Sequence, residues 1–104
     1  MQNFSLDPYV VDVLMPDLVG HDRRPAAFIV YLHLLRVAGR TRRDTVEASL
    51  QSIAASTGLS KSAVQAAIRH LRRRRLLDPA VEASVTSPKR RILRHWRRDG
   101  DGAG

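Results

Sequence analysis

The segment 60–75 carries the side chains of this chain whose types and spacing best suit a chemical task. Ser60 and Lys61 precede an amphipathic run, Gln65 and Arg69 follow at four-residue spacing, and four consecutive arginines come later. Hydroxyl, amide, ammonium and guanidinium groups form hydrogen bonds with phosphates and with the edges of nucleobases. The set contains no nucleophile beside a general base, so it indicates binding of a polyanion and not catalysis.

Positive charge is clustered in two places along the chain. The 104 residues include 18 Lys and Arg against 10 Asp and Glu, which gives a formal net charge of +8. One cluster comprises Arg69, Arg72, Arg73, Arg74 and Arg75, and the other comprises Lys89, Arg90, Arg91, Arg94, Arg97 and Arg98. Because clustered cations attract polyanions, this distribution predicts a nucleic-acid partner. The simpler alternative is a helical hairpin with a solvated basic face.

Enzymatic, metal and cofactor chemistry is not predicted. The chain has no cysteine, and its histidines are scattered without the spacing of metal ligands; they are His21, His33, His70 and His95. There is no glycine-rich phosphate loop. We therefore expect no enzyme, no metal, no cofactor and no small-molecule ligand. His70 is expected at the surface, on the flank of its helix, and Trp96 is expected to cover the core instead of stacking on a nucleobase.

The length suits one small domain. The start of the chain lacks the basic and apolar pattern of a signal peptide, and no apolar stretch approaches the roughly 20 residues that cross a bilayer. The expectation is a soluble cytoplasmic protein with no membrane partner, associated with the nucleoid when bound to DNA.

Two apolar helices are predicted in the first part of the chain. The N-terminal helix covers 5–19, with Asp7 as N-cap and Pro8 in its first turn, and Pro16 should end or kink it. The second helix, 25–38, is the most apolar and reads as a central core helix that Gly39 closes. A short strand is expected at 45–48.

Residues 49–74 predict two helices joined by a tight turn. Ser49 caps a helix over 50–56, Gly58 suits the left-handed position that ends it, and Ser60 caps a second helix from Lys61 to about Arg73. Val64, Ile68 and Leu71 share one narrow face of the second helix. The opposite side carries Ser62, Gln65, Arg69 and Arg73, with Arg72 on its flank.

The remaining residues predict a β-hairpin and a tail. Candidate strands cover 80–86 and 90–96, with turn chemistry at 87–89 between them. The tail, 98–104, is rich in Gly and Asp and is expected to be disordered. A single domain over 1–97 follows.

The stretch Leu50–Leu77, which contains IAASTGLSKSAVQAAIRHLRRRRLL, resembles the winged helix-turn-helix domain of bacterial transcription regulators of the GntR type and related families. The resemblance implies an α+β, mostly helical fold, with a small β-hairpin wing at 80–96. It also implies a recognition helix that starts at Lys61, a wing around 87–91 that touches the minor groove or phosphates, and binding as a dimer to two-fold symmetric sites.

The expected function is sequence-specific binding of double-stranded DNA in transcriptional regulation. Gln65 suits a bidentate contact with adenine and Arg69 one with guanine, whereas Arg72 and Arg73 suit the phosphate backbone. The full predicted DNA-binding set is Ser60, Lys61, Ser62, Gln65, Arg69, Arg72, Arg73, Lys89, Arg90 and Arg91.

One position departs from the family pattern. Arg75 stands where the family usually has glycine before the final apolar pair. If the helix continued, Arg75 would fall on the apolar side, so the helix should stop near Arg73 or Arg74. Arg75 should then adopt an unusual backbone conformation or lie in an extended exit.

Two other functions remain open at this point. A winged helix can serve as a protein interaction or dimerisation module without specific DNA binding, and arginine clusters also suit RNA. A homodimer is a further hypothesis, since 25–38 and 9–19 both present apolar faces. Those two faces can equally pack on each other within one chain.

Overall fold

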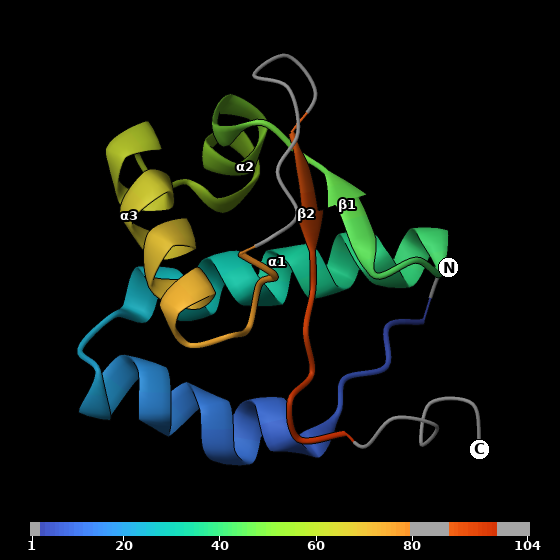
Figure 1. The fold of residues 1–104 in the computed structure, drawn as a ribbon, viewed down its shortest axis with the longest axis vertical. Helices are drawn as coiled ribbons and strands as arrows, with labels where there is room; N and C mark the ends of the chain where they lie inside the picture. Colours follow the sequence, from blue (N-terminus) through green and yellow to red (C-terminus); the bar gives the residue numbers. More distant parts are fainter. Residues whose placement is uncertain (1–2, 80–87, 98–104) are drawn as a thin grey trace.

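The computed structural model describes residues 3–79 and 88–97, and the elements in these residues belong to an α+β winged helix-turn-helix fold that is mostly helical (Figure 1). In chain order they are η1 (Val10–Leu14), η2 (Pro16–His21), α1 (Pro25–Thr41), β1 (Thr45–Glu47), α2 (Leu50–Thr57), α3 (Lys61–Arg73) and β2 (Lys89–Arg91). The first predicted arm of the wing, 80–86, and the predicted tail, 98–104, lie outside the described residues.

Helix α1 is the element on which the others pack, as the sequence analysis predicted for the most apolar segment. It contacts η2, α2, α3 and β1, and Figure 1 shows it crossing the middle of the molecule. Val30, Tyr31 and Leu34 of α1 are fully buried. The Tyr31 hydroxyl donates a hydrogen bond to the Leu93 carbonyl at 2.8 Å, and burial raises the pKa of this phenol.

The end of α1 differs from the prediction. Gly39 was expected to close the helix, but α1 continues to Thr41, and Arg42 takes the left-handed conformation at its end, with φ of 56°. The Arg42 N–H then bonds to the Ala38 carbonyl. Glycine is the cheapest residue in this conformation, yet it is not required there.

The N-terminal helix consists of wide turns. The Met15 N–H bonds to the Val10 carbonyl, and the Asp22 N–H bonds to the Asp17 carbonyl at 2.8 Å, so both bonds span five residues. Asp7 accepts a hydrogen bond from the Tyr9 N–H at 3.0 Å, as an N-cap does. Pro16 was expected to end or kink the helix, but helical turns continue through it to His21.

The sheet joins two strands that are distant in sequence. Strands β1 and β2 pair antiparallel, with Thr45 opposite Arg91 and Glu47 opposite Lys89. On the other edge of β2, the Asp78 N–H bonds to the Arg91 carbonyl and the Leu93 N–H bonds to the Leu76 carbonyl, both at 2.9 Å. Residues 76–78, which follow α3, therefore lie along residues 91–93, on the edge opposite β1.

The prediction of a strand over the whole of 90–96 is wrong in extent. Strand pairing ends with the isolated bridge between Ile92 and Leu77, and residues 95–96 form a turn. Trp96 stacks on Tyr9 with ring centroids 4.6 Å apart, and its indole N–H donates to Asp7 at 3.0 Å. As predicted, Trp96 packs against the core.

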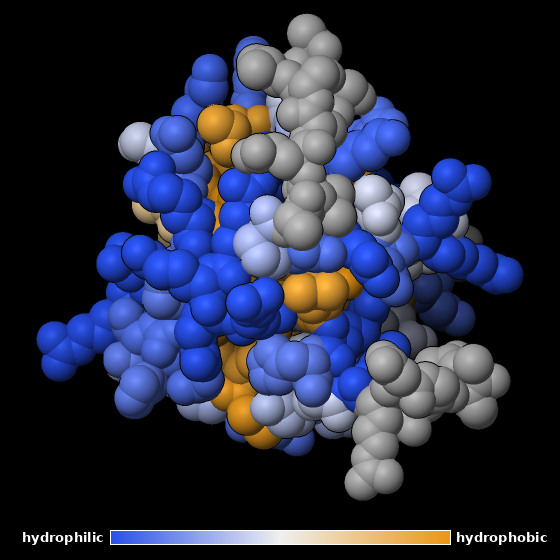
Figure 2. All heavy atoms as spheres, viewed as in Figure 1, coloured by the Kyte–Doolittle hydropathy of each residue, from blue (hydrophilic) through white to orange (hydrophobic). Residues whose placement is uncertain are grey.

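The face that carries α3 and β2 is mostly hydrophilic, with only small apolar areas between the charged side chains (Figure 2). Among the described residues, none of the helices is both long enough and apolar enough to span a bilayer.

Candidate nucleic-acid interface

The turn between α2 and α3 is fixed by local hydrogen bonds. The Ser49 hydroxyl accepts from the Ser52 N–H, and the Ser60 hydroxyl accepts from the Ala63 N–H, each at 3.1 Å. Gly58 has φ of 81°, and its N–H bonds to the Ala54 carbonyl at 2.9 Å. Both predicted caps and the predicted left-handed glycine are confirmed, so the start of α3 is set by groups within the turn.

Helix α3 presents one buried face and one exposed face, and the division follows the prediction. The buried residues are Val64, Ala67, Ile68 and Leu71. The exposed residues are Lys61, Ser62, Gln65, Arg69 and Arg73, and Arg72 is half-buried beside them. Because α3 packs on α1 and α2, its exposed side faces away from the core, as Figure 1 shows. A polyanion can therefore reach this side.

The exit from α3 is a Schellman motif with arginine in the glycine position. The helix ends at Arg73, and Arg75 has φ of 58°. The Arg75 N–H bonds to the Arg72 carbonyl at 3.1 Å, and the Leu76 N–H bonds to the Leu71 carbonyl at 2.9 Å. This is the hydrogen-bond pattern that places the left-handed residue just after a helix. The expectation that Arg75 takes an unusual backbone conformation is confirmed.

A second cluster of charged side chains, which the sequence analysis missed, joins α3 to η2. Arg74 forms ion pairs with Asp17 and with Asp22, and the Nε to Oδ2 distance to Asp22 is 3.0 Å. His70 contacts the same carboxylate oxygen, with 2.7 Å between His70 Nε2 and Asp22 Oδ2. Since only 14% of the His70 side chain is exposed, the expectation of a surface histidine is wrong. We call Asp17, His21, Asp22, His70 and Arg74 the clamp.

Asp22 is the centre of the clamp. Its side chain is 8% exposed. The hydrogen bond with His21, together with that from His70 and the charge of Arg74, holds the pKa of Asp22 below its usual 3.8, although burial acts in the opposite direction. Asp22 is therefore a carboxylate at neutral pH and can bind cationic groups.

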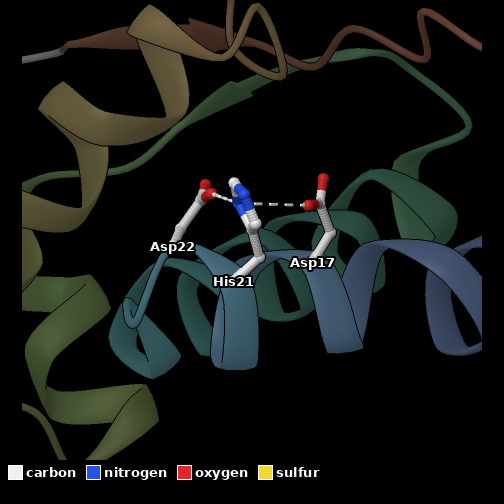
Figure 3. A group of neighbouring side chains, drawn as sticks. All are labelled: Asp17, His21 and Asp22. Atoms are coloured by element: carbon white, nitrogen blue, oxygen red, sulfur yellow. Dashed lines mark hydrogen bonds and ion pairs between the residues drawn. The ribbon is translucent and has the colours of Figure 1, made fainter.

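Three clamp residues also have the donor atoms of a metal site. Figure 3 shows His21 between Asp22 and Asp17, at 2.9 Å and 3.8 Å from Nδ1 to the nearest carboxylate oxygens. Imidazole and carboxylate groups are common ligands of zinc. However, the Arg74 guanidinium already contacts both carboxylates, and it supplies the positive charge that the pair requires. The carboxylates of Asp17 and Asp22 thus already have a cationic partner in Arg74.

The strand β2 separates the three predicted wing contacts. Lys89 and Arg91 are exposed, whereas Arg90 is only 7% exposed and donates from Nε to the Ala48 carbonyl at 2.9 Å. Burial and the nearby charge of Arg72 lower the pKa of Arg90. The alternation of a strand explains the difference, because neighbouring residues point to opposite faces. Arg90 does not lie with the exposed cations of the predicted set.

The structure therefore brings together most of the predicted set. Ser60 and Lys61 stand at the start of α3, and Ser62, Gln65, Arg69 and Arg73 follow along its exposed side.

The clamp had one signal in the sequence: the first 22 residues contain four Asp and no Lys or Arg, which offers partners to an arginine run. His33 is half-buried, and burial lowers its pKa.

Comparison with known protein families identifies a helix-turn-helix domain in this chain. The model of a helix-turn-helix domain family matches residues 24–77, just over half of the chain. This range contains α1, β1, α2, α3 and the exit through Arg75. No curated protein and no solved structure matches the chain significantly.

Proposed function

This chain belongs to a helix-turn-helix domain family whose fold binds DNA, and from that premise we propose that it binds double-stranded DNA in a sequence-specific manner. The observation that carries the proposal is the exposed side of α3, where Gln65 and Arg69 lie one turn apart between cationic ends. An amide and a guanidinium are the two groups that pair best with adenine and guanine in the major groove.

The proposed contacts divide into two kinds. Gln65 and Arg69 read base edges from the middle of the exposed side. Ser60, Lys61 and Ser62 bind phosphate at the start of α3, where backbone N–H groups point outward, and Arg72 and Arg73 bind phosphate near its end. The first kind gives sequence preference and the second gives affinity that falls with salt.

The wing adds a second phosphate contact. Lys89 and Arg91 are exposed on β2, and we assign them to the DNA backbone. Arg90 supports them indirectly, because its bond to Ala48 ties β2 to the segment that leads into α2. Arg91 Nη1 lies 3.8 Å from Asp78 Oδ2, so a DNA phosphate would compete with this carboxylate for the Arg91 guanidinium.

The biological role proposed for this binding is transcriptional regulation by a bacterial protein of the GntR type or a related group. It rests on the resemblance of Leu50–Leu77 to those regulators. The helix η2 lies outside residues 24–77, which the family model matches, but it packs on α1, which lies inside them. This packing supports a single domain over 1–97. A cytoplasmic location and a homodimeric state belong to the same proposal.

Selection of bound sequences from a random duplex library tests this function. The proposal expects enrichment of a defined motif, and Arg69→Ala should remove the preference at one base pair. Lys61→Ala is the matched comparison, since it should weaken binding to selected and random duplexes equally and lower the salt slope by about one unit. Equal loss on both duplexes for Arg69→Ala would contradict the assigned roles.

A further inference from the structure

The segment that joins η2 to α1 carries two exposed cations that the predicted DNA-binding set does not contain. This segment, which we call the connector, consists of Asp22, Arg23 and Arg24. In the part of the chain that the structure describes, the side chains of Arg23 and Arg24 have neither an ion-pair nor a hydrogen-bond partner. Arg74, by contrast, is held by Asp17 and Asp22. The two connector cations are therefore available to an external anion.

The connector is attached directly to the C-terminal end of α3. Asp22 Oδ2 lies 2.7 Å from His70 Nε2 and 3.0 Å from Arg74 Nε. The connector backbone is fixed as well, because the Arg24 N–H bonds to the Leu18 carbonyl at 2.8 Å. Figure 1 shows this segment at the same outer edge of the molecule as α3, and Figure 2 shows that this edge is hydrophilic. The connector thus forms the rim of α3 on the side of η2.

Exposed arginines surround the contact between the connector and α3. Two of them follow Asp22 in the chain, and the other two stand immediately before and after Arg74, the partner of Asp22. All four are exposed, and they are Arg23, Arg24, Arg73 and Arg75. Because neighbouring cations raise the local positive potential, this rim attracts a polyanion more strongly than the clamp alone would.

The dimensions of a duplex place phosphates where the connector lies. An α-helix with its side chains is about 10–12 Å across, and the major groove of B-DNA is about 12 Å wide. A helix in this groove nearly fills it, so a segment held against the flank of the helix meets the phosphates that line the groove. The connector is held in this way against α3 by Asp22.

We propose that Arg23 and Arg24 form a phosphate-binding site for the DNA backbone on the side of α3 that faces η2. The inference rests on the proposed function, because it extends the contact surface of α3 to a segment outside the predicted set. Guanidinium groups donate charge-assisted hydrogen bonds to phosphate oxygens, and such contacts fix the register of a protein on the duplex without reading its sequence. The wing and the connector then both bind backbone, while α3 reads base edges.

Fluorescence anisotropy of duplex binding at a series of salt concentrations tests the site. Arg23→Gly should raise the dissociation constant about three- to tenfold at low salt, equally for selected and random duplexes, and lower the salt slope by about one. Glycine is the suitable replacement, because Arg23 has φ of 55° and glycine adopts this conformation without strain. Arg24→Ala should act in the same direction, and the double variant should lower the slope by about two. Arg23→Lys, which keeps the charge, should retain most of the slope.

Arg42→Gly is the matched control. Arg42 is exposed and has φ of 56°, so this substitution removes the same charge and makes the same change in the backbone. Arg42 follows α1 whereas Arg24 precedes it, and the 17 residues of this helix separate the two by roughly 25 Å. Since charges are screened beyond about 10 Å at 0.1 M salt, Arg42→Gly should leave the salt slope unchanged. Equal changes of slope in Arg23→Gly and Arg42→Gly would overturn the proposal.

Failure of this site and failure of the proposed function give different results. If the chain binds duplex DNA and Arg69→Ala loses the preference at one base pair, while Arg23→Gly behaves like Arg42→Gly, only the phosphate contact of the connector is wrong. If the folded wild type binds no duplex at low salt, the proposed function is wrong and the contact fails with it.

Discussion

The two sides of α3 are built from one basic segment and differ in what surrounds their charges. On the side of η2, His70 and Arg74 meet the carboxylates of Asp17 and Asp22, and the His70 side chain is only 14% exposed. On the opposite side, Gln65 and Arg69 are exposed to solvent. The contrast teaches that the basic segment of α3 divides into two parts: one joins α3 to η2, and the other is exposed to solvent.

Removing the centre of the clamp should have the largest effect. Asp22→Asn leaves the His70 imidazole and the Arg74 guanidinium without their charged acceptor, and we expect a loss of about 2–3 kcal/mol in the free energy of unfolding. Urea unfolding measures it. Asp12→Asn, which changes an exposed carboxylate of η1, should change stability by less than about 0.5 kcal/mol. Equal effects of the two substitutions would break the comparison.

The exposed side is tested by a pair of arginine substitutions. Arg69→Ala should weaken binding to the selected duplex by about 1–3 kcal/mol while leaving the unfolding free energy unchanged. Arg74→Ala should do the reverse, lowering stability while keeping the difference in affinity between selected and random duplexes. Fluorescence anisotropy and urea unfolding on both variants measure the two quantities. A larger loss of discrimination in Arg74→Ala than in Arg69→Ala would reverse the assigned roles.

The left-handed positions on the two sides of α3, Gly58 before it and Arg75 after it, should respond to substitution in opposite directions. Arg75→Gly removes the cost of a side chain at φ of 58°, so we expect a gain of about 0.5–1 kcal/mol in unfolding free energy. Gly58→Ala should lose about 1 kcal/mol, because nothing lies within 4 Å of an added Cβ and the backbone conformation alone opposes it. A loss of stability in Arg75→Gly would show that its side chain contributes to the exit.

The clamp should also give stability a dependence on acid, which is the smallest of the expected effects at neutral pH. The pKa of Asp22 is lower in the folded chain than its usual 3.8, so its contribution is fully present above 3.8 and is lost as the pH falls through the folded value. Unfolding curves at a series of pH values should therefore show a decline that Asp22→Asn reduces. Asp7, whose pKa is also lowered, leaves part of the slope in place. An unchanged slope in Asp22→Asn would contradict the effect.

Local sequence signals predicted the motif but not the contacts between distant segments. Ser49, Gly58 and Ser60 act through bonds within a few residues, so their roles follow from the sequence alone. The conformation of Arg75 could be predicted from helix periodicity. A continued helix would place this charged side chain on the apolar face, so the helix had to end before it. The clamp could not be predicted in the same way, since Asp22 and His70 are 48 residues apart in the chain.

Strand geometry limited the prediction of the wing. Alternation shows that Arg90 and its neighbours point to opposite faces, but only the packing of β2 on the core shows which face is inward. Val46 opposite Arg90 and Ile92 beyond it are buried, which places Arg90 on the inner face. The N-terminal segment was predicted as a helix over 5–19 that Pro16 ends or kinks, and the hydrogen bonds that span five residues there have no signal in the apolar pattern.

The most direct test of the central claim is duplex selection with the wild type and Arg69→Ala side by side. If the exposed side of α3 reads base edges, the wild type should enrich a defined motif and Arg69→Ala should lose the preference at one position of it. The result that would contradict the claim is the absence of duplex binding by the folded wild type at low salt, or a motif that Arg69→Ala leaves unchanged.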